Sequence, residues 1–173
     1  MLMRIKRILK HFWLGTVPTR HTLDPARVHK LTQAVAASEQ RHSGEIRICV
    51  EASLPLSYLW RKASPRALTR QRALMLFGKL RVWDTAHNNG VLIYLLLAER
   101  AIEVVADRGL NELVTAQVWQ SMVADMGTAF KAGHFEDGLA DALAQVSALL
   151  IQHFPLAAGE INPNELPDTP VLR

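Results

Sequence analysis

The sequence predicts an α/β fold, a three-layer α/β/α sandwich around a small mixed sheet that contains a hairpin. Amphipathic and strongly apolar stretches follow one another in the order helix, strand, helix, strand, strand, helix, helix. Short apolar strands among several helices are typical of a sheet that is covered on both faces. The last two strands are joined by a short turn, so they pair as a hairpin and the sheet is not purely parallel.

The first helix and strand follow from capping and alternation. Asp24 is suited to the N-cap and Pro25 to the first helical position, so a helix begins here. Ser43 and Gly44 end it. Residues 45–51 then alternate between apolar and polar side chains, which predicts a strand.

The central elements follow from apolar periodicity. Apolar residues at helical spacing over 69–80 predict the second helix. Residues 91–97 are uniformly apolar, which indicates a strand buried on both faces. Residues 102–106 follow the turn as its hairpin partner. Two further helices are predicted over 119–130 and 139–150.

Three parts of the chain are expected: a basic amphipathic segment over 1–20, the α/β domain over 21–155, and an irregular, proline-rich tail over 156–173. The single Cys49 excludes an internal disulfide, and no cysteine and histidine spacing is typical of zinc. We expect Cys49 to be a buried thiol in the first strand. No apolar run approaches the ~20 residues that a membrane span needs.

The N-terminal segment combines positive charge with apolar residues at helical spacing. Charges interrupt every apolar run that could form a secretory signal, so we expect a cytoplasmic protein that is peripheral at the inner membrane. The segment is suited to an anionic membrane surface or a membrane-protein partner. The alternative is that its apolar stripe packs on its own domain. The expected contact residues are Arg4, Lys6, Arg7, Lys10, Phe12 and Trp13.

Charge is divided unevenly along the chain. Residues 1–81 carry 16 Lys or Arg and 4 Asp or Glu, a balance of +12, whereas residues 82–173 carry 4 and 12, a balance of −8, which together give the net +4. Arg66 and Arg70 lie one turn apart on a predicted helix and are suited to binding an anion such as phosphate. The alternative is a solvated face whose charge the acidic half offsets. Nucleic acid is not an expected partner, since no recognition motif occurs.

Polar residues gather at the ends of the two hairpin strands. Asp84, Asn88 and Asn89 precede the first strand, and Asp107 follows the second. A hairpin brings these positions together, and such oxygen ligands suit Ca²⁺ or Mg²⁺. The alternative is ordinary turn and cap chemistry. Glu45 and Asp24 are further candidate carboxylates.

Four stretches of the sequence, in this order, resemble the TPM-domain family, and the resemblance covers about residues 24–155. They are Gly44-Glu45-Ile46-Arg47-Ile48, Asn89-Gly90-Val91-Leu92-Ile93-Tyr94, Ala106-Asp107-Arg108-Gly109-Leu110 and the stretch from Phe130 to Leu139. The resemblance implies an α/β/α sandwich, and it links the chain to acid phosphatase activity, calcium binding and accessory roles beside membrane complexes. The family's acid before Asn-Gly is replaced by Asn88, whereas its carboxylate after the hairpin is kept as Asp107.

Three functions remain open at this stage. We expect an accessory or binding module near the cytoplasmic membrane surface. The alternative is a weak divalent-cation-dependent phosphatase acting on small phosphate esters. In it Asp107, with Asp84 or Asn88, holds the cation, and Arg108 or Arg70 steadies the phosphate. The third is a scaffold without a ligand. The sequence does not indicate an oligomeric state.

Overall fold

A computed structural model describes residues 7–12 and 24–173. It contains one four-stranded mixed sheet with the order β3-β2-β1-β4. The strands are β1 (Ile46–Glu51), β2 (Val91–Leu96), β3 (Ala101–Ala106) and β4 (Val171–Leu172). β1 pairs in parallel with β2 and β4, whereas β2 and β3 form the expected antiparallel hairpin.

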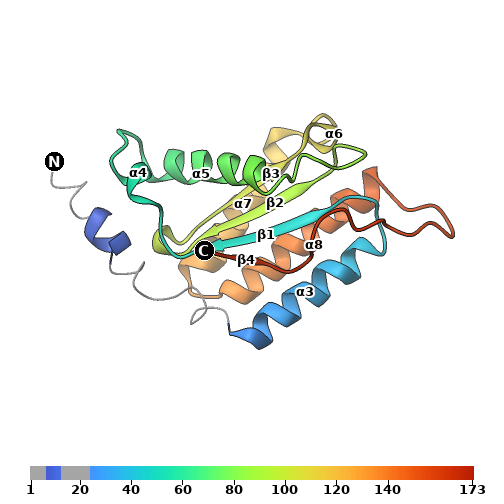
Figure 1. The fold of residues 1–173 in the computed structure, drawn as a ribbon, viewed down its shortest axis with the longest axis horizontal. Coiled ribbons are helices and arrows are strands. Elements are labelled where there is room, and N and C mark those ends of the chain that lie inside the picture. The colour runs from blue at the N-terminus through green and yellow to red at the C-terminus, as the bar shows by residue number, and fades with distance from the viewer. Residues whose placement is uncertain (1–6, 13–23) are drawn as a thin grey trace.

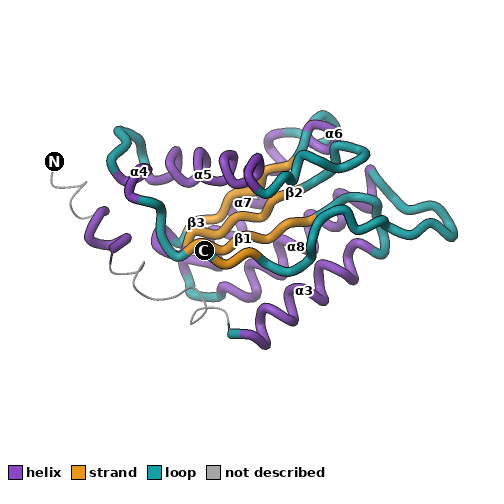
Figure 2. Tube along the Cα trace, in the orientation of Figure 1, coloured by secondary structure: helices purple, strands orange, loops and turns teal. Residues whose placement is uncertain are grey.

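Helices cover both faces of the sheet, as Figures 1 and 2 show. On one face lie α4 (Leu56–Leu59) and α5 (Pro65–Lys79). On the other face lie α3 (Pro25–Glu39), α7 (Ala116–Lys131) and α8 (Phe135–His153). The described residues also form the 3-10 turn η1 (Leu97–Glu99), α6 (Arg108–Asn111) and a short helix over residues 7–12. The predicted three-layer α/β/α sandwich is confirmed.

Strand alternation divides the interior into two cores. On β1, Ile46, Ile48 and Val50 point toward α3, α7 and α8, whereas Cys49 points toward α5. β2 is buried along its whole length, which confirms the prediction of a strand covered on both faces. Burial raises the pKa of the Cys49 thiol to about 12, so this cysteine is an inert core residue, as expected.

Local capping rules hold at the first helix. The Asp24 carboxylate accepts a hydrogen bond of 2.8 Å from the Arg27 N–H, and Pro25 occupies the first turn. The second helix begins four residues earlier than its apolar stripe predicts, because Ser64 caps it and Pro65 starts it.

The C-terminal residues differ from the irregular tail that the sequence predicts. Val171 and Leu172 form β4 on the open edge of β1, and Arg173 exchanges backbone hydrogen bonds with Val50 and Ala52. A strand of two residues is too short to show the alternation that predicts strands from sequence. This pairing depends instead on the open edge that β1 offers.

Candidate functional site

The strand-end residues that the sequence predicts do lie together. Because Val91 pairs with Ala106, the residues before β2 meet those after β3. The Asp107 N–H donates to the Gly90 carbonyl at 2.9 Å, and the Gly109 N–H donates to the Asn88 carbonyl at 2.9 Å. This close approach requires Gly109, since a Cβ there would lie 2.7 Å from the Asn88 carbonyl oxygen.

Most polar groups of this strand-end cluster are already engaged. The Arg108 Nε donates to Asn88 Oδ1 at 3.0 Å, and Arg81 forms an ion pair with Asp84. Buried Asn89 donates to the Ser43 carbonyl at 3.1 Å. Asp107 alone offers an oxygen, Oδ2, that is buried without a hydrogen-bond partner in the described part of the chain.

The strand-end cluster therefore does not fit the divalent cation that the family resemblance implies. A guanidinium occupies the Asn88 oxygen, and a second one neutralises Asp84. Within residues 7–12 and 24–173, no group of three or more His, Cys, Asp or Glu side chains is arranged to hold a metal ion. Ca²⁺ needs six to eight oxygen ligands, which this arrangement does not supply.

Arg66 and Arg70 line a groove of about 700 Å³ between α5, the edge strand β3 and α7. The Arg70 Nη1 donates to the Val104 carbonyl at 2.8 Å and lies 3.4 Å from the Glu103 carboxylate. Burial raises the pKa of Glu103, although the charge of Arg70 opposes this. Both arginines are exposed, but Arg70 is already engaged with the backbone and a carboxylate at the sheet edge.

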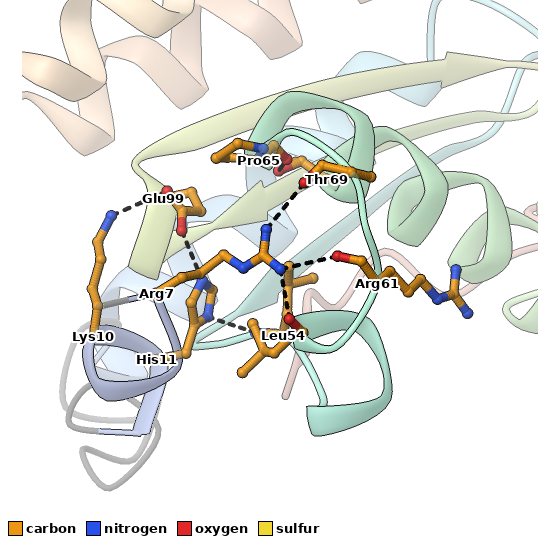
Figure 3. A network of polar contacts seen from close by, with 10 residues as sticks. Arg7, Lys10, His11, Leu54, Arg61, Pro65, Thr69 and Glu99 are labelled. Carbon is orange, nitrogen blue, oxygen red and sulfur yellow. Dashed lines mark hydrogen bonds and ion pairs between the residues drawn. The ribbon is translucent and has the colours of Figure 1, made fainter. Parts of the chain in front are cut away.

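A third group of residues fastens the helix of residues 7–12 to the domain (Figure 3). The Arg7 guanidinium donates to the carbonyl oxygens of Leu59 at 2.5 Å and of Arg61 and Ala63 at 3.1 Å. The Leu59 carbonyl ends α4 and the other two follow it, where helix-end acceptors lack partners within the helix. Arg7 therefore caps α4 from a distant part of the chain.

His11 completes this attachment from the same side of the helix. Its Nδ1 accepts the Leu54 N–H at 3.1 Å, so its Nε2 carries the proton and donates to Glu99 Oε1 at 2.8 Å. Lys10 lies 3.1 Å from the other Glu99 oxygen. Although burial raises the pKa of Glu99, the hydrogen bonds from His11 and Lys10 outweigh it and lower the pKa overall.

The polar attachment leaves apolar side chains facing solvent. Leu9 and Phe12 on the N-terminal helix are 57% and 66% exposed. Leu56 and Trp60, on the segment whose carbonyl oxygens Arg7 binds, are 62% and 67% exposed. Ile8 is partly buried against the α5 core. We call these four exposed residues, together with the helix of residues 7–12 and α4, the apolar tip.

The structure describes three of the six residues that the sequence predicts to contact a membrane or a partner. Arg7 and Lys10 bind the domain, whereas Phe12 is exposed. Arg4, Lys6 and Trp13 lie outside the described residues. The sequence did not single out Glu99, Leu56 or Trp60; an acid in a hairpin turn and apolar residues in a loop have no local pattern that separates them from ordinary turn residues.

None of the described helices is both long enough and apolar enough to cross a bilayer.

Comparisons with known proteins agree on the fold. The TPM domain model matches residues 17–149. The solution structure of BA42 from the psychrophilic bacterium Bizionia argentinensis is 27% identical, with a TM-score of 0.71 over 86% of this chain and 94% of that one. The N-terminal domain of a protein from P. gingivalis shares the fold at 19% identity, with a TM-score of 0.52 over 82% of this chain and 94% of that one. No curated protein matches significantly.

Proposed function

The chain belongs to the TPM-domain family, and on that premise we propose that it is a binding module that docks on an anionic membrane surface through its apolar tip. Its position is then peripheral, at the cytoplasmic face of the membrane. The observation that carries the proposal is the outward direction of Leu9 and Phe12 on a helix whose Arg7 and His11 face the domain.

This orientation differs from that of an ordinary surface helix, although Ile8 packs partly against the α5 core. A helix packed on its own domain normally buries its apolar stripe and exposes its charges. Here the hydrogen bonds of Arg7 and His11 attach the helix, and the fold leaves the apolar side chains of Leu9 and Phe12 largely unburied. Exposed apolar side chains that gather on one part of a surface are typical of interaction sites.

The chemistry of the apolar tip suits a lipid headgroup layer. Trp60 is amphipathic, and such indoles favour the interface between lipid and water. Next to it stand Arg61 and Lys62, both exposed, in a stretch that has no acid between Glu51 and Asp84. Basic residues beside an apolar patch add attraction of about 1 kcal/mol each for anionic lipid.

Vesicle co-sedimentation of the full chain tests the proposal. We expect binding to vesicles that contain phosphatidylglycerol and weaker binding to vesicles of phosphatidylcholine alone. The double variant Leu9→Ser with Phe12→Ser removes two of the exposed apolar anchors, and full burial of each is worth about 1.5–3 kcal/mol. We therefore expect at least a tenfold weaker association.

A matched control removes the same number of exposed apolar residues elsewhere. Leu113 and Val118 are 53% and 41% exposed near α7. The variant Leu113→Ser with Val118→Ser should bind vesicles like the unmodified chain. Equal binding by both double variants, or binding that does not depend on anionic lipid, would contradict the proposal.

The cation-dependent phosphatase receives less support from the site. Arg108 is bound to Asn88 and Asp84 is paired with Arg81, so the groups that this chemistry needs are engaged with one another. Turnover of a small phosphate ester that is lost in Asp107→Asn and retained in Asp84→Asn would restore that alternative.

A further inference from the structure

The outer strand β3 borders a groove that the proposed function does not use. Among the described residues, the sheet ends at β3 on one side and at β4 on the other. α5 packs on one face of β3 and α7 on the other, and the groove between them and the strand edge has a volume of about 700 Å³. Proteins normally cover an open strand edge, blunt it with charge or pair it with another strand.

The pairing of β3 with β2 determines which backbone groups face this groove. The Asp107 N–H donates to the Gly90 carbonyl at 2.9 Å, so these two residues form a hydrogen-bonded antiparallel pair. Such pairs alternate along the ladder, so every second residue of β3 turns its N–H and carbonyl groups away from β2. These outward-facing residues are Ile102, Val104 and Ala106.

Arg70 shows that these edge groups accept hydrogen bonds from outside the sheet. Its Nη1 donates to the Val104 carbonyl at 2.8 Å, where an added strand would place a backbone N–H. The Arg70 side chain is 44% exposed, so it has room to move off the edge when a strand takes its place. Arg70 therefore covers the edge without closing it.

The two walls of the groove differ in chemistry. The α5 wall carries the positive charges of Arg66 and Arg70, with the small side chain of Ala67 between them. The α7 wall carries the apolar side chains of Trp119 and Val123. Successive side chains of an extended strand point to opposite faces of a sheet. A strand added to β3 would therefore direct every second side chain toward the arginines and the others toward the apolar wall.

We propose that this groove binds an extended segment of a partner protein, in which acidic and apolar residues alternate, as an additional strand beside β3. Backbone pairing with the edge supplies affinity, and the two walls select the side chains. The charge is complementary, because the two arginines of the groove outnumber its one acid, Glu103. A second copy of this chain is a poorer occupant, since pairing two β3 edges would bring the arginines of both α5 helices to the same face.

Fluorescence anisotropy with the full chain and three labelled pentapeptides tests the proposal. The first peptide alternates glutamate with valine and should bind. The second has glutamine in place of glutamate, which keeps strand pairing and removes the charge. The third has proline in place of valine, which keeps the charge and prevents strand pairing. We expect the second and third to bind roughly tenfold more weakly than the first, because each loses one of the two contributions.

A charge reversal in the groove tests the same point from the side of the protein. Arg66 is exposed, so Arg66→Glu should fold normally and bind the glutamate peptide roughly tenfold more weakly. The glutamine peptide should bind this variant as it binds the unmodified chain. Lys30→Glu is the matched control, because Lys30 is exposed on α3 and does not line the groove. It should leave the binding of both peptides unchanged.

Hydrogen exchange of the β3 amides gives a second readout. The bound glutamate peptide should slow exchange at Ile102 and Val104, whose N–H groups face the edge. The amides of Glu103 and Val105 already donate to β2, so their exchange should change less.

Three results would overturn the proposal. Equal binding of the glutamate–valine and glutamate–proline peptides, with exchange in β3 unchanged, would reduce the groove to a general attraction for anions. Equal binding of the glutamate peptide to the unmodified chain and to Arg66→Glu would place the peptide elsewhere. A dimer in analytical ultracentrifugation whose Ile102 and Val104 amides are protected without peptide would assign the edge to a second copy of the chain.

Discussion

The His11 Nε2 lies 2.8 Å from Glu99 Oε1, and this contact ties the N-terminal helix to the turn of the hairpin 88 residues further along the chain. His11 is buried, and the Leu54 N–H fixes its tautomer from the other side. Because both ring nitrogens of His11 are bound, the helix face that carries His11 is held against the domain. Leu9 and Phe12 are then left exposed to solvent.

Glu99→Ala should loosen the N-terminal helix without unfolding the domain. The substitution leaves the buried His11 N–H without an acceptor, at a cost of about 1–3 kcal/mol. We expect the Leu54 amide, which His11 accepts, to exchange its hydrogen at least fivefold faster in hydrogen-exchange measurements. Lys10→Ala is the control, since it removes only the exposed half of the contact and should change exchange little.

Charge removal next to Trp60 should weaken vesicle binding in a salt-dependent way. Arg61→Gln with Lys62→Gln removes two exposed positive charges, each worth about 1 kcal/mol at an anionic surface, so we expect roughly thirtyfold weaker association. Lys30→Gln with Lys79→Gln removes the same charge elsewhere and should have a smaller effect. Raising the salt concentration should narrow the difference between the two double variants, and a difference that is insensitive to salt would argue against an electrostatic contribution.

Arg72→Met should destabilise the α5 side of the sheet strongly. Arg72 Nε donates to Glu51 Oε2 at 2.8 Å in the interior, and the Tyr94 hydroxyl donates to the same oxygen at 2.7 Å. Removing the arginine leaves the buried Glu51 carboxylate with the more distant Arg173, whose Nε lies 4.0 Å away, as its counter-charge. The free energy of unfolding should therefore fall by up to about 3–5 kcal/mol in urea titrations. Arg81→Met breaks an exposed ion pair instead, and we expect a loss below about 1 kcal/mol.

His42 should make the fold sensitive to mild acid. The Nδ1 of the buried ring donates to the Gly44 carbonyl, so in the neutral ring Nε2 accepts from the Ser38 hydroxyl. Burial lowers its pKa from 6.5 to about 4. Between these values the unfolded chain binds a proton that the folded chain does not, so stability is lost as the pH falls from 6.5 to 4.

Between pH 6.5 and pH 4, the protonation of His42 should lower the free energy of unfolding by about 3 kcal/mol. Urea denaturation of the unmodified chain and of His42→Gln over pH 4–7.5 measures it, since the other titrating groups are common to both. We expect the difference in free energy of unfolding between the two to change across the window. Parallel curves would show that His42 does not titrate between the folded and unfolded states.

The sequence by itself determined the layers of this protein. Asp24 and Pro25 begin a helix, alternation over 45–51 forms a strand, and the apolar run after Gly90 forms the buried centre of the sheet. The strand ends of the hairpin also meet as predicted, because pairing register follows from a short turn. These features depend on residues that are near one another in the chain.

Only the tertiary structure decided the partners of the remaining polar groups. Val171 and Leu172 become a strand because β1 has an open edge, and Asp168 meets Glu39 as a result of that pairing. The N-terminal helix faces outward because Glu99 receives His11. Periodicity reports which side of an element is apolar, but a hydrogen bond or an ion pair between distant segments depends on where the fold places both groups.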